Sequence, residues 1–64
     1  MLCLSEILLQ HHDLQNFDEL VSVVERKARG GELFFRMDVR PPFLDTPESW
    51  EDRLEAAFAV AGKR

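Results

Sequence analysis

Two adjacent histidines and an aspartate, His11-His12-Asp13, are the residues of this sequence that most resemble metal ligands. Cys3 is the only cysteine, so a zinc site would need its thiolate, both histidines and carboxylates. Adjacent residues on a helix point about 100° apart and rarely bind one ion together. No second pair of ligands stands elsewhere in the chain. We therefore predict no metal site and no cofactor.

The sequence contains histidines, carboxylates and arginines, which can act in acid and base catalysis, but their spacing matches no catalytic motif. There is no Gly-rich phosphate loop and no serine or cysteine in an elbow-like context. A chain of this size also leaves little room for a pocket of several hundred cubic ångströms. We predict that the protein is not an enzyme and assign no catalytic residue. The enzymatic alternative is a small toxin-like nuclease that uses histidine and arginine at a dimer seam, with His11 and His12 as the candidate histidines.

An aromatic residue and two arginines, Phe34, Arg36 and Arg40, project on one side of a strand predicted near residues 32–40. Such a face binds single-stranded nucleic acid when rings stack on bases, at about 1–3 kcal/mol per base, and arginines contact phosphate. Alternatively, a helix covers Phe34 and the arginines pair with surface acids. Because the formal net charge of −4 repels phosphate at long range, we hold nucleic-acid binding as the alternative function.

Two further aromatic residues, Phe43 and Trp50, are candidate contacts for a protein partner. Phe43 and Leu44 follow the end of the predicted strand and are expected to tuck under the helices. Trp50 is expected at the edge of an apolar helical stripe, where a half-exposed tryptophan often anchors an interface. The candidate binding residues are therefore Phe34, Arg36, Arg40, Phe43 and Trp50.

The clearest element is an amphipathic helix near residues 17–29. Its apolar residues recur at the spacing of one helical face: Phe17, Leu20, Val21, Val24 and Ala28. Asn16 is placed to cap the first turn, with Glu19 three positions later as in a capping box. Gly30-Gly31 supply a left-handed exit.

The next segment, near residues 32–40, changes period to strict alternation. Its apolar face is predicted to contain Leu33, Phe35, Met37 and Val39. Pro41 and Pro42 end it, because proline donates no ladder hydrogen bond. This segment is predicted to be a strand with one buried face.

A second amphipathic helix is predicted near residues 47–61. Thr46 stands at the N-cap position and Pro47 at the first helical position. Acidic residues of the first turn complement the helix dipole. The apolar stripe consists of Trp50, Leu54, Ala57, Phe58 and Ala61.

Residues 2–9 suit either a helix or a strand, and we favour the helix. If they form a strand, they pair with residues 32–40 inside a βαβ unit. If they form a helix, the strand at 32–40 must find its partner in another chain, because unpaired backbone groups are costly. We therefore expect a homodimer joined through this strand.

The composition bounds the class of protein. With 64 residues, the chain is expected to be one small globular α+β domain spanning 1–64. A single cysteine suits a reducing compartment, so we expect a cytoplasmic protein. The apolar start is interrupted by Ser5 and Glu6, which argues against a membrane segment.

The function expected from these exclusions is a small non-enzymatic interaction or regulatory protein. A chain without a metal framework, a phosphate loop or a predicted pocket is expected to act mainly by binding other molecules through its surface. The expected partner is another protein, and the protein is expected to act as a homodimer. Nucleic-acid binding is the alternative, and a membrane partner is not expected.

Overall fold

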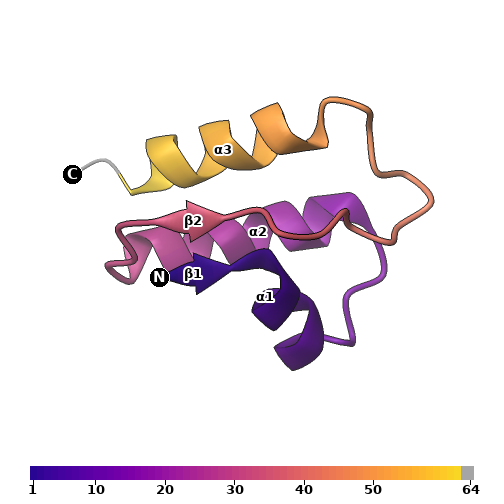
Figure 1. Cartoon of the computed structure of the whole chain (residues 1–64), viewed down its shortest axis with the longest axis horizontal. Helices are drawn as coiled ribbons and strands as arrows, with labels where there is room; N and C mark the ends of the chain where they lie inside the picture. Colours follow the sequence, from indigo (N-terminus) through magenta and orange to yellow (C-terminus); the bar gives the residue numbers. More distant parts are fainter. Residues whose placement is uncertain (63–64) are drawn as a thin grey trace.

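The computed structural model describes residues 1–62, which contain three helices and one two-stranded sheet. The elements in chain order are β1 (Leu2–Cys3), α1 (Leu4–Gln10), α2 (Phe17–Arg29), β2 (Phe35–Arg36) and α3 (Trp50–Ala61). Figure 1 shows β2 lying between β1 and α3. The predicted α+β class is confirmed for this part of the chain.

The sheet is parallel and is formed within one chain. Leu2 lies opposite Phe35 and Cys3 opposite Arg36, and the Leu2 backbone N–H donates to the Phe34 carbonyl at 2.9 Å. The connection between the strands passes through α1 and α2, as a parallel pair requires. The first segment is therefore both a strand and a helix. The expectation that a helix there would leave β2 without an internal partner was wrong.

Helix α2 forms at the predicted residues with the predicted ends. The Asn16 side-chain oxygen accepts the Glu19 backbone N–H at 2.9 Å. The Glu19 carboxylate accepts the N–H of Gln15 at 2.7 Å, one residue before the cap, and Gly31 has a φ of 107°. The buried face of α2 consists of Phe17, Leu20, Val23, Val24 and Ala28, so Val23 takes the place of the predicted Val21, which is only half-buried.

Strand β2 is much shorter than the predicted strand at 32–40. Only Phe35 and Arg36 pair with β1, because β1 turns into α1 at Leu4 and offers no further ladder. The predicted apolar face is also only partly buried. Phe35 and Met37 pack against the core, whereas Leu33 is 80% exposed and Val39 is 39% exposed.

Helix α3 begins at Trp50, three residues later than predicted. Thr46 is not its cap, since this side chain is buried and its hydroxyl donates to the Pro41 carbonyl at 3.3 Å. Ser49 holds the N-cap position and its side chain makes no capping hydrogen bond. Of the predicted stripe only Leu54 is fully buried, while the half-buried members are Trp50, Ala57, Phe58 and Ala61.

The core lies where α1, α2, α3 and the sheet meet. Its buried residues are Leu2, Leu4, Ile7, Phe17, Leu20, Val23, Val24 and Leu54. The most extensive contact between elements joins α2 to α3. Helix α3 also lies beside β2 (Figure 1). Within residues 1–62, no helix combines the length and the apolar character needed to cross a membrane.

Candidate functional site

An open groove with mainly apolar walls separates the segment around β2 from α3. It encloses about 490 Å³, and its lining residues are Leu33, Phe34, Phe35, Met37, Glu55, Phe58 and Ala59. We call it the β2–α3 groove. Its size is in the range of ligand sites, so the expectation that this chain leaves little room for a pocket was wrong.

The two walls of the groove are joined by an aromatic contact. Phe35 of β2 and Phe58 of α3 stack with ring centroids 5.3 Å apart and an angle of 28° between the planes. On α3, the three- and four-residue spacing of Glu55, Phe58 and Ala59 places all three side chains on one helical face. The position of the groove is thus set by the register of β2 and by the face that α3 turns toward it.

Large apolar side chains stand exposed on the strand side of the groove. Leu33 is 80% exposed and Phe34 is 67% exposed. In the part of the chain that the structure describes, β1 is the one strand that pairs with β2. The other edge of β2 therefore has no hydrogen-bonded neighbouring strand. That edge faces α3 (Figure 1). Exposed apolar residues beside an unpaired strand edge are features of protein-binding surfaces.

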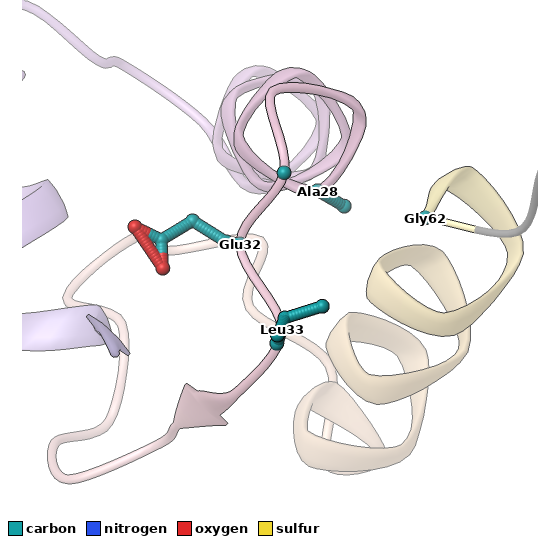
Figure 2. Close-up of a pocket in the computed structure, with 5 residues that line it drawn as sticks. Ala28, Glu32, Leu33 and Gly62 are labelled. Carbon is teal, nitrogen blue, oxygen red and sulfur yellow. The ribbon is translucent and has the colours of Figure 1, made fainter.

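A second hollow continues the groove toward the end of α3. It encloses about 520 Å³ and is lined by Ala28, Gly31, Glu32, Leu33 and Gly62. Figure 2 shows the Leu33 side chain directed toward α3, with Glu32 pointing the other way. Because Leu33 lines both hollows, they meet at this side chain.

The electrostatic character of the groove comes from α3. Glu55 is the one charged side chain among the described residues that line it. Glu51, one turn before Glu55, and the neighbouring Asp52 are exposed as well. With the exposed Arg53 included, α3 carries a net charge of −2 at neutral pH, so the α3 side of the groove is acidic.

The five predicted contact residues do not gather in one place. Phe34 lines the β2–α3 groove, whereas Arg36 and Arg40 are exposed but are not among its lining residues. Phe43 is half-buried in a different hollow, and Trp50 is half-buried against the core at the start of α3. Leu44, expected to tuck under the helices, is fully exposed.

Sequence reasoning missed most of the groove. Leu33 was interpreted as part of a buried strand face, and Phe58 as part of a buried helical stripe. Glu55 and Ala59 carried no functional signal at all. These residues become a site only through the placement of α3 beside β2, which the spacing within either segment does not encode.

Asp38, which follows β2, is held by hydrogen bonds from Ser5 near the start of α1. The Ser5 hydroxyl donates to Asp38 Oδ2 at 2.6 Å, and the Ser5 backbone N–H donates to Oδ1 at 3.1 Å. These hydrogen bonds, from the hydroxyl first and the N–H second, lower the pKa of Asp38, with a smaller contribution from the Arg36 charge. The segment after β2 is thereby tied to α1.

The histidines lie apart from the β2–α3 groove. His11 is half-buried and His12 is exposed, and both line a hollow of about 230 Å³ with Leu8, Leu14, Pro42 and Phe43. Residues 1–62 contain no cluster of three or more histidine, cysteine, aspartate or glutamate side chains placed to hold a metal ion.

Comparisons with protein-family models, with curated proteins and with solved structures found no match to this chain. The described residues form a small α+β structure with an open, largely apolar groove beside a short parallel sheet.

Proposed function

We propose that the protein is a small, cytoplasmic, non-enzymatic interaction or regulatory protein that binds another protein at the β2–α3 groove. The observation that carries this proposal is the exposure of Leu33 and Phe34 on the wall of that groove. Removing apolar surface from water is favourable by about 25 cal/mol for each square ångström, and the entropy cost of association reduces the net stabilisation of a complex. In the unbound protein, the Leu33 and Phe34 side chains remain in contact with water.

The composition of the groove favours binding over catalysis. Glu55 is the one ionisable side chain among the described residues that line it, and catalysis of proton transfer commonly needs a second group nearby. The groove is open to solvent, so water is not excluded from it. A second polypeptide is the occupant that such a surface suits.

The reason given above for expecting a homodimer, a missing partner strand for β2, no longer applies. Since β1 already pairs with β2, the chain does not need a second copy to supply the partner strand. The outer edge of β2 still has no neighbouring strand in the described chain, so a second copy is one candidate occupant of the groove. Light scattering across a dilution series measures this directly.

Nucleic-acid binding through Phe34, Arg36 and Arg40 is the alternative function, favoured by the exposure of all three side chains. It predicts binding to a single-stranded oligonucleotide that weakens steeply with salt and falls when both arginines become alanine. Oligonucleotide binding that is absent at low salt would remove this alternative. The toxin-like nuclease predicts cleavage that is lost when His11 or His12 becomes alanine.

The proposal is tested by selecting a random peptide library against the wild-type protein and against Leu33→Asp. Leu33 is exposed, so the substitution changes the groove while the core stays intact. Leu44→Asp is the matched control, because Leu44 is also exposed and lies outside the residues that line the groove.

The expected result is a set of peptides that bind the wild type and Leu44→Asp but lose binding to Leu33→Asp. Peptides that bind all three proteins equally would place the contact elsewhere. If no peptide is enriched on the wild type over an empty support, protein binding at the groove is rejected.

A further inference from the structure

We infer that the occupant of the β2–α3 groove is a basic, extended segment of a partner protein that carries bulky apolar side chains. The inference rests on the proposed function and adds the chemistry and the conformation of the partner. It combines three features that meet at this place: an apolar lining, an unpaired strand edge and an acidic helix face.

The lining specifies the apolar part of the segment. Phe34 and Phe58 provide aromatic surface, and Ala59 leaves space between the walls. The hollow of about 490 Å³ accommodates a side chain such as that of leucine or phenylalanine. A large apolar residue of the partner therefore gains contact with both walls at once.

The strand edge specifies the conformation. β2 pairs with β1 on one side, and in the described chain its second edge has no partner strand. An extended segment presents its own N–H and C=O groups at the spacing of such an edge, while its alternate side chains point into pockets. The groove is lined by residues around β2 on one side and by residues of α3 on the other, so an extended segment bound in it lies along β2.

The helix face specifies the charge. Glu55 lines the groove, and Glu51 lies one turn earlier on the same face of α3. The one ion pair among the described residues joins the Met1 amino group to Glu32, away from these carboxylates. Lysine or arginine side chains flanking the apolar residue of the segment would meet Glu51 and Glu55.

A second copy of the chain fits this surface less well. Each copy has a formal net charge of −4. A two-fold interface at the groove would bring the same acidic face of α3 toward its own copy. Like charges placed opposite each other weaken an interface, whereas a basic segment is attracted.

The test uses two short labelled peptides that differ only in charge. In one peptide arginine alternates with leucine and phenylalanine, and in the other glutamate replaces every arginine. Fluorescence anisotropy measures the affinity of each peptide for the wild type, for Glu55→Arg and for Glu6→Arg. Glu6 is an exposed residue of α1 that does not line the groove. Glu6→Arg changes the net charge of the protein by the same amount as Glu55→Arg, so it controls for net charge.

The arginine peptide is expected to bind the wild type about threefold to tenfold more tightly than the glutamate peptide, as partly exposed ion pairs allow. Glu55→Arg is expected to remove or reverse that preference, and Glu6→Arg to retain it. Added salt should reduce the difference between the peptides.

Three results of these binding and light-scattering measurements would overturn the inference, and a fourth comes from the random library. One is equal or no binding of the two peptides, and another is an equal effect of the two substitutions. The third is a dimer of the wild type that Leu33→Asp dissociates, which would place a second copy in the groove. If the random library instead yields neutral or acidic peptides that depend on Leu33, protein binding stands and the basic partner is rejected.

Discussion

Phe35 of β2 and Phe58 of α3, which both line the β2–α3 groove, stack with ring centroids 5.3 Å apart. Both rings are half-buried and pack against the core. The pair therefore has two consequences: it joins α3 to the sheet, and it fixes the separation of the groove walls.

Phe58→Ala is expected to lower the free energy of unfolding by about 1–3 kcal/mol. The loss combines the aromatic contact with part of the burial of the ring, and it is smaller than for a fully buried phenylalanine. Urea unfolding followed by Trp50 fluorescence measures it. Val60→Ala, at an exposed position of α3, is the control and should change stability by less than about 0.5 kcal/mol. If Phe58→Ala lowered the free energy of unfolding no more than Val60→Ala does, the stacked pair would contribute no stability.

Asp45→Ala is expected to destabilise the protein by about 1 kcal/mol, because Asp45 Oδ1 accepts the Phe17 backbone N–H at 3.0 Å. That N–H belongs to the first residue of α2 and has no partner within the helix. Asp45→Asn keeps an acceptor oxygen and should retain most of the stability. Thermal unfolding of both variants by circular dichroism makes the comparison, and similar losses in the two would contradict the capping role.

The contact between Asp45 and Phe17 illustrates which parts of the fold could be predicted. Helix α2 was predicted with correct ends because its signals are local: the Asn16 cap, the apolar spacing and the left-handed Gly31. The cap from Asp45 comes from a residue 28 positions away, and no local pattern announces it. Contacts of this kind can be predicted only once the relative positions of distant segments are known.

The strands were harder to predict for the same reason. Alternation predicted residues 32–40, but the ladder is limited to Phe35 and Arg36 by the short length of β1. Leu33, predicted to belong to a buried strand face, lies outside β2 and is 80% exposed. The groove could not be predicted at all, because it arises from the placement of α3 beside an unpaired edge. Of the predicted contact residues, Phe34 is the one that lines it.

Leu54→Ala should unfold a large fraction of the protein at room temperature. Leu54 is fully buried, and such substitutions cost about 2–5 kcal/mol. A domain of this size has only about 3–5 kcal/mol of stability in total. Leu44→Ala removes the same atoms from a fully exposed position, so it should leave stability within about 0.5 kcal/mol of the wild type. Circular dichroism compares the two, and a folded Leu54→Ala protein would contradict the packing of α3.

Acid is expected to weaken the attachment of the segment after β2 to α1. The two hydrogen bonds from Ser5 lower the pKa of Asp38 in the folded protein, so the folded state binds this proton less readily than the unfolded state. The stabilisation is thus present above the unfolded pKa of an aspartate, about 3.9, and is lost as pH falls through the folded pKa. An NMR titration of the Asp38 carboxyl carbon measures the folded pKa. In Ser5→Ala the hydroxyl donor is gone, so this pKa should rise toward the ordinary value, and the stability of the variant should fall less between pH 6 and pH 3. An unchanged Asp38 titration in Ser5→Ala would mean that the hydroxyl hydrogen bond does not persist in solution.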